Sequence, residues 1–346
     1  GKLIDSPAYS GKISPKNNMI YFGAFGIGFA IPFIIILLMQ LLRYKIEGRN
    51  DVERLTSLPI LADIPVASEV AKGRADIVVK ENKNNMMEEV FRSLRTNLQF
   101  MLKDDEKTIM LTSNTSGEGK TFIAANLAVS FALLGKKVVL VGLDIRKPRL
   151  STLFDINDKN KGITRILVHD NPTLADVREQ IAPSEVNVNL DLLMAGPIPP
   201  NPAELLQRDS LDKIFDILKQ EYDYIIVDTA PVGLVTDTLS IGRVSSAAVF
   251  VSRADYTPKS AFGFINELSE SGKLPNSAIV INAVDLSKRK YGYYYGYGRY
   301  GKYGKYVSYK AYGAYGRYGK RYGSYGHYGD YTMSRYGDKD DNSFKR

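Results

Sequence analysis

The loop sequence TSNTSGEGKT, at residues 112–121, constrains the possible fold of this chain more than any other stretch. It begins at the end of an apolar run at 107–113 and leads into a helical pattern at 120–134. A glycine-rich loop at a strand-to-helix junction directs its backbone N–H groups toward an anion. The junction therefore predicts a phosphate-binding loop, although Asn114 stands where the usual GxxxxGK[ST] pattern has its first glycine. The alternative is a glycine-rich turn that only starts a helix.

The predicted loop gives a role to each of its last six residues. The backbone N–H groups that would hold phosphate oxygens belong to Ser116, Gly117, Glu118, Gly119, Lys120 and Thr121. The Lys120 ammonium group would lie near the β- and γ-phosphates of a nucleotide, and the Thr121 hydroxyl group would bind Mg²⁺. These six residues are the expected nucleotide contacts.

Apolar strands and helices alternate along the rest of the region from 84 to 286. Further apolar runs are found at 137–143, 190–195, 222–228, 247–252 and 277–284. Helical patterns are found at 87–102, near 203–219 and near 259–271. Continuous apolar strands separated by helices are typical of a parallel sheet covered on both faces. We therefore expect an α/β fold with a P-loop NTPase-like parallel sheet.

Acidic residues follow two of these predicted strands. Asp228 ends one of them, and Asp144 ends another and is followed by the basic residue Arg146, which we expect to contact the nucleotide. Ligands of such sheets bind at the carboxyl ends of the strands, where an aspartate can hold Mg²⁺ through water. Asp144 is a second candidate for the metal, and Asn282 is assigned to the adenine by its position alone. The combination predicts a Mg²⁺-nucleotide site.

An uncharged run of 24 residues at 19–42 precedes the predicted domain. About 20 apolar residues suffice to cross a bilayer as a helix, and Pro32 is tolerable in a membrane helix. A buried core helix and a signal peptide are the alternatives. We expect a transmembrane helix after a polar segment at 1–18, and then a charged linker at 43–83.

The last part of the chain, residues 287–346, is rich in tyrosine and glycine. Glycine beside nearly every tyrosine raises the entropic cost of order, and a spacing of three aligns no face of a helix. We therefore expect a disordered, exposed tail. Its tyrosines are Tyr291, Tyr293, Tyr294, Tyr295, Tyr297, Tyr300, Tyr303, Tyr306, Tyr309, Tyr312, Tyr315, Tyr318, Tyr322, Tyr325, Tyr328, Tyr331 and Tyr336.

The net charge of +8 belongs to the tail and not to the predicted domain. From Lys288 onward there are fourteen Lys and Arg residues and four Asp residues, a charge of +10, so the remainder sums to −2. A near-neutral folded part argues against a specific nucleic-acid surface. The basic, aromatic tail could still bind RNA or anionic lipid.

The residue types that are missing narrow the chemistry further. Cysteine is absent, which excludes thiolate nucleophiles, disulfide bonds and cysteine-metal sites. The two histidines, His169 and His327, are too few for a histidine-rich metal site. Any chemistry must therefore use Lys, Asp, Glu, hydroxyl groups and the backbone.

Taken in order, the motifs resemble those of the bacterial tyrosine kinases that accompany exopolysaccharide export. They are a membrane span followed by LTSLPILADIP, ExxRxxR at Glu89, Arg92 and Arg95, SGEGKT, VVLVGLDIR, GPIPPNPAELL, IIVDTAP and the tyrosine cluster. The resemblance implies ATP- and Mg²⁺-dependent phosphorylation of tyrosine on a P-loop scaffold. It makes Lys120, Asp144 and Asp228 the expected catalytic residues and the tail tyrosines the expected phosphoacceptors.

The resemblance also implies a homo-oligomeric ring in which each subunit places its tail in a neighbour's active site. Glu89, Arg92 and Arg95 match the motif of the subunit contact, although a solvated charged face is the alternative. Other expected partners are a phosphotyrosine phosphatase, the polysaccharide polymerase and export machinery, and membrane lipid. Since ATP is cytoplasmic, we expect a single span in the bacterial inner membrane with the kinase domain and tail in the cytoplasm. A periplasmic region would precede residue 1.

One departure from the family pattern concerns the second acidic strand. The family usually has Asp-x-Asp there, and this chain has Gly142, Leu143 and Asp144. The first acid, a candidate base for the tyrosine hydroxyl, is absent, so the identity of the base stays open. Two other functions remain: a non-catalytic nucleotide-binding scaffold, and a ParA/MinD-like ATPase switch, whose signature lysine is replaced here by Thr115.

The composition of the tail suggests an electrostatic switch. Each phosphate adds about −1.5 to −2 charges, so roughly five or six phosphotyrosines would cancel the charge of the tail. We expect the unmodified tail to be docked and the heavily phosphorylated tail to be released, with looser ring assembly.

Overall fold

The computed structural model describes two compact units, Gly1–Tyr44 and Lys45–Arg346. The described residues are 17–41, 44–66, 77–79, 86–156, 158 and 160–286. The polar segment at 1–16 and the tail at 287–346, with all seventeen expected phosphoacceptors, lie outside the described residues.

The described part of the first unit is one long helix, α1 (Asn17–Leu41). By length and composition alone, Asn18–Leu38 is a candidate membrane span near the start of the chain, and its side chains are not buried. Pro32 lies within the helix. Its apolar surface includes the rings of Phe25 and Phe29, whose centroids are 4.9 Å apart. The helix lies where the sequence predicted it.

The second unit contains an eight-stranded sheet with the order β1-β8-β7-β2-β6-β3-β5-β4. The strands are β1 (Ile60–Pro65), β2 (Thr108–Ser113), β3 (Val138–Leu143), β4 (Ala182–Pro183), β5 (Leu190–Leu193), β6 (Tyr224–Thr229), β7 (Ala247–Arg253) and β8 (Ser277–Val284). Neighbouring strands are parallel, except that the short β4 runs antiparallel to β5. The predicted α/β class with a parallel-dominated sheet is confirmed.

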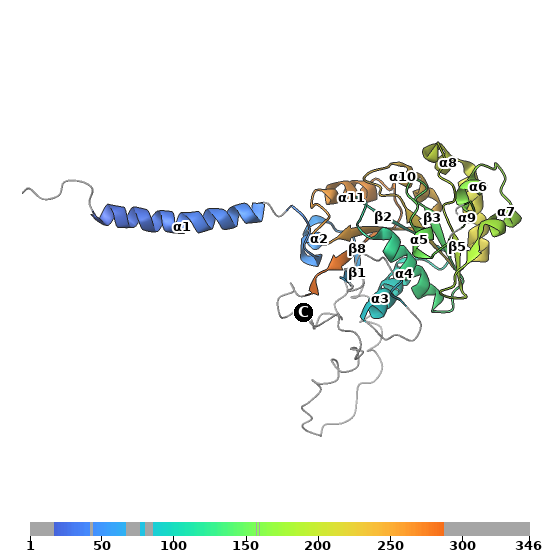
Figure 1. Ribbon diagram of the computed structural model, residues 1–346, viewed down its shortest axis with the longest axis horizontal. Coiled ribbons are helices and arrows are strands. Elements are labelled where there is room, and N and C mark those ends of the chain that lie inside the picture. The colour runs from blue at the N-terminus through green and yellow to red at the C-terminus, as the bar shows by residue number, and fades with distance from the viewer. Residues whose placement is uncertain are drawn as a thin grey trace, which may run out of the picture. The chain divides into compact units, whose positions relative to one another are not determined.

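Both faces of the sheet are buried, because successive side chains of each strand enter different cores. Met110 in β2 belongs to one core, and its neighbours Ile109 and Leu111 belong to the other. The first core is covered mainly by α9 (Asp209–Glu221) and α11 (Ala261–Glu270), and the second by α3 (Met86–Met101) and α4 (Lys120–Ala132). Figure 1 shows α11 on one side of the strands and α3 and α4 on the other.

Shorter helices connect these elements. They are α2 (Arg49–Leu55), α5 (Leu150–Leu153), α6 (Ile163–Leu167), α7 (Leu174–Gln180), α8 (Pro202–Gln207) and α10 (Asp237–Ile241), followed by a 3-10 turn at Gly242–Val244. The expected single helix near 203–219 is two helices, α8 and α9. Arg208 separates them because its backbone is extended, with φ −69° and ψ 149°.

The stretch at 43–83, expected as a linker, contributes to the sheet. It contains α2 and the edge strand β1, which pairs in parallel with β8. Pro65 is the last residue of this strand. An edge strand pairs on one side only, so a proline there removes no necessary hydrogen bond.

Candidate nucleotide site

The phosphate loop between β2 and α4 takes a backbone shape that requires glycine. Gly117 and Gly119 have φ values of +90° and +97°, in the left-handed region. A Cβ atom on Gly119 would lie 2.1 Å from Nδ2 of Asn282. Helix α4 begins at Lys120, and no side chain of the described residues caps its first turn. Its first N–H groups are therefore available to an anion.

The side chain of Glu118 braces the loop from inside. It is buried, and its Oε2 accepts a hydrogen bond from the backbone N–H of Thr115 at 2.8 Å, while Oε1 accepts one from the hydroxyl group of Thr257. Burial raises the pKa of Glu118, and these hydrogen bonds act against that rise. The sequence predicted only a backbone role for Glu118.

Three consecutive carbonyl groups of the loop are each held by a side chain from β7, β8 or the loop after β7. The hydroxyl of Tyr256 donates to Ser116 O at 2.9 Å, Nη1 of Arg253 donates to Gly117 O at 3.0 Å, and Nδ2 of Asn282 donates to Glu118 O at 2.9 Å. Tyr256 also stacks near Arg253, whose guanidinium carbon lies 5.4 Å from the ring centroid. These contacts fix the loop from its outer side.

The sequence analysis did not find Arg253 and Tyr256. The available signal was their position in VSRADY, immediately at the carboxyl end of a buried strand. Asn282 was expected at the adenine, and its side chain amide is engaged with the loop and with the N–H of Ala283. Its contact with adenine stays a prediction.

The four residues expected at the phosphates and the metal lie together. Nζ of Lys120 is 3.4 Å from Oδ2 of Asp144, and the Thr121 hydroxyl donates to Oδ2 of Asp228 at 2.8 Å. Lys120, Asp144 and Asp228 are buried. The backbone N–H of Asp144 donates to Asp228 O at 3.1 Å, which fixes the two strand ends against each other.

Asp228 has the features of a metal ligand. Burial raises its pKa to about 6; Lys120 and the Thr121 hydrogen bond lower the pKa, and Asp144 raises it further. Its Oδ1 atom is buried and has no hydrogen-bond partner among the described residues. A free carboxylate oxygen beside a threonine hydroxyl is a donor set that Mg²⁺ accepts, so these residues fit the metal.

The remaining ligands of such an ion would come from outside the protein. Within the described part of the chain, no group of three or more His, Asp and Glu side chains could hold a metal by itself. Mg²⁺ is commonly bound by one or two carboxylates together with substrate phosphates and water. The donor set therefore suits a metal that arrives with a nucleotide.

Arg146 lies near this cluster but is paired elsewhere. Its Nε and Nη2 atoms donate to Oδ2 of Asp237, at 2.8 Å and 2.5 Å, and Asp237 is buried at the start of α10. The sequence placed Arg146 at the nucleotide. In the structure its guanidinium group connects the loop after β3 to α10, and a nucleotide contact stays a prediction.

Gly142, where the family pattern has an acid, lies beside Asp228 in the pairing of β3 with β6. A Cβ atom on Gly142 would lie 3.2 Å from the backbone nitrogen of Ala195 and 3.3 Å from Cδ1 of Leu150. Neighbouring atoms therefore crowd the space that a side chain would need. Of the two acids of the family's Asp-x-Asp pattern, only Asp144 is present here.

The ExxRxxR residues on α3 divide into two groups. Arg92 forms ion pairs with Glu88 at 2.9 Å and Glu89 at 3.0 Å, and its side chain is 47% exposed. Arg95 instead donates to Ser130 O on α4 at 2.5 Å, and burial lowers its pKa. Glu89 and Arg92 are thus available to a partner, whereas Arg95 binds its own chain.

Comparison with known proteins identifies one family model and several similar tyrosine kinases. A family model described as an AAA domain matches residues 106–254. The tyrosine-protein kinase YwqD of Bacillus subtilis is 35% identical over 221 residues, which are 63% of this chain and 91% of YwqD. EpsB of Ralstonia nicotianae, named as a tyrosine-protein kinase, is 30% identical over 312 residues, which are 86% of this chain and 40% of EpsB.

The chain thus spans nearly all of YwqD but less than half the length of EpsB. Among solved structures, the kinase domain of the Escherichia coli tyrosine kinase ETK matches with a TM-score of 0.63 and 26% sequence identity. The match covers 73% of this chain and all of that domain.

Proposed function

The chain belongs to the bacterial tyrosine kinases of the exopolysaccharide family, and from that premise we propose that it phosphorylates the tyrosines of its own tail with ATP. The observation that carries the proposal is the buried cluster at the end of the phosphate loop. There Lys120 contacts Asp144, and Thr121 donates to Asp228, whose second oxygen has no partner among the described residues. These are the groups that a metal-dependent phosphoryl transfer needs.

Each part of the cluster has a distinct task in the proposed reaction. The N–H groups of residues 116–121 bind the β-phosphate, and Lys120 balances the charge that moves to the bridging oxygen. Thr121 and Asp228 would hold Mg²⁺, which neutralises charge on the β- and γ-phosphates. Tyr256, Arg253 and Asn282 keep the loop in shape through its three carbonyl groups.

We propose that Asp144 accepts the proton from the hydroxyl group of the acceptor tyrosine. The tyrosine oxygen bonds to the γ-phosphorus, the bond from that phosphorus to the bridging oxygen breaks, and ADP leaves. Asp228 is tied to Thr121 through Oδ2, whereas Asp144 has its carboxylate between Lys120 and the N–H of Lys147. A loose transition state depends mainly on positioning and charge, so a weak base suffices and Gly142 is tolerated.

We also propose that the transfer occurs between subunits of a ring. The exposed pair of Glu89 and Arg92 on α3 supports this, because both side chains can reach a neighbour. The candidate span in α1 supports a place in the bacterial inner membrane, with the kinase domain and tail on the cytoplasmic side. A phosphatase and the polysaccharide export machinery would be its partners, and polymerisation and export would be the regulated process.

The test is incubation of the full chain in detergent with Mg-ATP, followed by phosphotyrosine mass spectrometry, beside the variant Lys120→Met. We expect phosphate on the tail tyrosines of the wild type and none in the variant. ATP hydrolysis without phosphotyrosine would favour an ATPase switch. ATP binding without either product would favour the scaffold that Gly142 suggests.

A further inference from the structure

A second concave site lies at the other end of β3 from the nucleotide cluster. It is a cavity of about 290 Å³ between α7, α9 and β5. Lys137, which directly precedes β3, lines it, whereas Asp144 directly follows β3 at the nucleotide site. The cavity is lined by Lys137, Leu174, Val177, Arg178, Ile181, Asp191, Ile217, Leu218, Glu221 and Tyr222.

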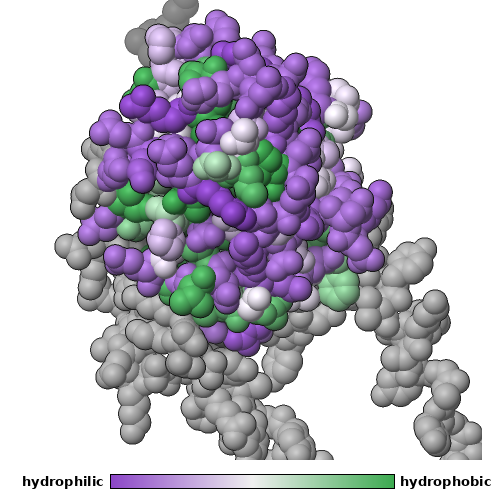
Figure 2. Space-filling model, turned by 90° about the vertical axis from the view of Figure 1, so that its right-hand side faces the viewer, coloured by the Kyte–Doolittle hydropathy of each residue, from purple (hydrophilic) through white to green (hydrophobic). Residues whose placement is uncertain are grey.

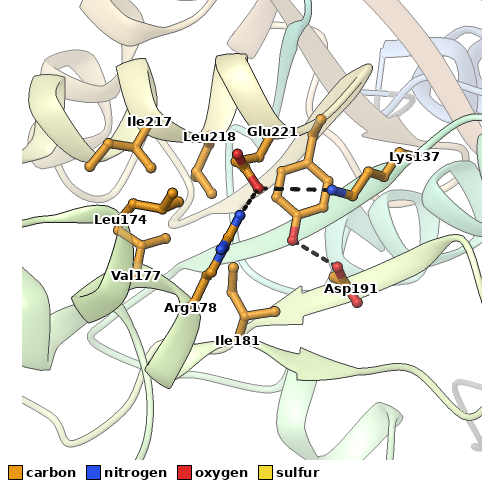
Figure 3. A pocket seen from close by; sticks show the side chains of 10 residues that line it. Lys137, Leu174, Val177, Arg178, Ile181, Asp191, Ile217, Leu218 and Glu221 are labelled. Atoms are coloured by element: carbon orange, nitrogen blue, oxygen red, sulfur yellow. Dashed lines mark hydrogen bonds and ion pairs between the residues drawn. The ribbon is translucent and has the colours of Figure 1, made fainter.

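The cavity has an apolar side and a polar side. Figure 3 shows Leu174, Val177 and Ile217 grouped on one side, and Lys137 and Asp191 on the other. Such a pocket suits a group that is apolar along its body and polar at its tip, such as a phenol ring. The proposed nucleotide site does not use this cavity.

Fixed ion pairs and hydrogen bonds hold the polar side in place. Nη2 of Arg178 is 2.8 Å from Oε2 of Glu221, and Nζ of Lys137 is 4.0 Å from the same oxygen. The Tyr222 hydroxyl donates to Oδ2 of Asp191 at 2.7 Å, and Nζ of Lys137 lies 5.0 Å from the centre of the Tyr222 ring. The single carboxylate of Glu221 therefore lies beside both cations.

The chain segment that forms most of the cavity is acidic. Residues 163–223 contain eleven Asp and Glu residues and five Lys and Arg residues, a net charge of −6, while Lys137, which also lines the cavity, lies outside this range. None of these carboxylate residues is buried. Figure 2 shows this end of the domain as mostly hydrophilic, with hydrophobic areas that are small and separate. The end of the domain thus offers negative charge and no broad apolar face.

We propose that this cavity receives a tyrosine of the chain's own unphosphorylated tail. The tail repeats Gly-Lys-Tyr and Gly-Arg-Tyr, as at 298–306 and 316–318, and carries +10 charges from Lys288 onward. A ring would enter the apolar side of the cavity, and the adjoining Lys or Arg would meet the surrounding carboxylates. The repeat and the acidic segment are complementary in charge, and the partly exposed side chains of Leu174, Ile181 and Ile217 would contact the ring.

The tail is long enough to reach the cavity from its own domain. It follows β8, which is five strand positions from β5 in the sheet, and strands are about 4.8 Å apart. With the height of the strands added, the straight-line separation is on the order of 35 Å, or roughly a dozen extended residues, and a path around the packed domain is longer. The tyrosines in the later part of the tail can therefore reach it. Tethering raises their effective concentration to about millimolar, so a weak site is sufficient.

Phosphorylation would end this contact. A phosphotyrosine is larger than the ring and brings about −1.5 to −2 charges toward an acidic surface. The site would then hold only unmodified tyrosines and would release the tail as phosphate accumulates. The docking itself does not depend on kinase activity; only the release rests on the proposed function.

The absence of cysteine from the chain allows a direct test. Gln220→Cys places a thiol at an exposed position of α9 beside the cavity, and Ser324→Cys places one in the tail. In the control pair, Ser57→Cys replaces Gln220→Cys. Ser57 is exposed and precedes β1, the strand next to β8, so an undirected tail would favour it. Phosphatase-treated full chain in detergent is reacted with a short bismaleimide.

We expect at least a fivefold higher intramolecular cross-link yield for Gln220→Cys than for Ser57→Cys. Neutralising Glu179, Glu185 and Asp216 with their amides, or raising the salt, should reduce that yield at least threefold. Equal yields at the two positions, or links only between separate chains, would overturn the proposal. Prior incubation with Mg-ATP should lower the yield in proportion to phosphotyrosine. A higher yield after phosphorylation would identify a phosphotyrosine receptor and also overturn it.

Docking and catalysis can fail separately in this design. If no phosphotyrosine forms but the Gln220→Cys link persists in phosphatase-treated protein, the docking proposal stands and the kinase proposal fails. If phosphotyrosine forms but the cross-link yield of Gln220→Cys never exceeds that of Ser57→Cys, the kinase proposal stands and the docking proposal fails.

Discussion

The hydroxyl of Thr121 lies 2.8 Å from Oδ2 of Asp228, while Oδ1 of the same carboxylate is buried without a partner among the described residues. The contact joins the first turn of α4 to the end of β6. It leaves one carboxylate oxygen to which no described residue donates a hydrogen bond. A metal that enters with a nucleotide would satisfy it.

Thr121→Ala should weaken the metal site. The variant loses a hydroxyl that would bind Mg²⁺ and that also lowers the pKa of Asp228. We expect about a 10- to 100-fold increase in the Mg²⁺ concentration needed for half-maximal phosphotyrosine formation. Thr121→Ser keeps the hydroxyl and is the matched control. An unchanged Mg²⁺ requirement in the alanine variant would exclude Thr121 as a ligand.

Asp228 should make the stability of the nucleotide-free protein depend on pH. Burial raises its pKa to about 6, above its value in the unfolded chain. Its stabilising contribution is therefore fully present below the unfolded pKa near 4 and is lost as the pH rises through about 6. Asp228→Asn should gain up to about 3 kcal/mol over the wild type at pH 7.5 and little at pH 4. Thermal unfolding without Mg²⁺ at both pH values measures this. A stability difference between Asp228→Asn and the wild type that grows toward pH 4 would contradict this prediction.

Tyr256→Phe should loosen the phosphate loop. It removes the donor to Ser116 O, and a hydrogen bond of about 1 kcal/mol corresponds to roughly a fivefold loss of nucleotide affinity. Titration of a fluorescent ATP analogue measures the change. Tyr224→Phe, at the amino end of β6, is the control and should bind as the wild type does. Equal affinity in both variants would show that the hydroxyl does not support the loop.

Substitution of Arg95 should lower the stability of the fold, whereas substitution of Arg92 should weaken assembly. Arg95→Ala loses a partly buried, charged hydrogen bond to Ser130 O, so we expect about 1.5–3 kcal/mol of destabilisation. Arg92→Ala loses only exposed ion pairs, so its unfolding should change by less than about 1 kcal/mol. Native mass spectrometry should show fewer large oligomers for Arg92→Ala. Normal oligomers in that variant would remove Arg92 from the ring contact.

Gly142→Ala tests how tightly the site is packed where the family acid is missing. Its Cβ atom would crowd Ala195 and Leu150, so we expect a loss of about 1–3 kcal/mol. Gly263→Ala in α11 is the control, because a Cβ atom there meets nothing within 4 Å and should stabilise the helix by about 0.5–1 kcal/mol. Chemical denaturation compares them. A gain in stability at Gly142 would mean that the space is open.

The sequence predicted the parts of the site that depend on a single strand end. The phosphate loop, Asp144 and Asp228 each follow a buried strand, and a parallel sheet brings such ends to one edge. That these strand ends lie together could therefore be predicted without knowing any distance between them. The confirmed α/β class rests on the same strand-and-helix pattern.

The sequence could not show which side chains reach across the fold. Arg253 and Tyr256 hold the loop because β7 lies beside β2 in the sheet, a pairing that local patterns do not encode. Arg146 was expected at the nucleotide from its charge, and its position beside Asp237 depends on the packing of α10. β1 was missed because a short edge strand has little pattern of its own.

The most direct test of the central claim is the ratio of ADP released to phosphotyrosine formed by the full chain with Mg-ATP, counted in one reaction. A kinase with this site should form one phosphotyrosine for each ADP until the acceptors are used, and Lys120→Met should form neither product. Abundant ADP with no phosphotyrosine would contradict the account and place the chain among ATPases that use the same fold.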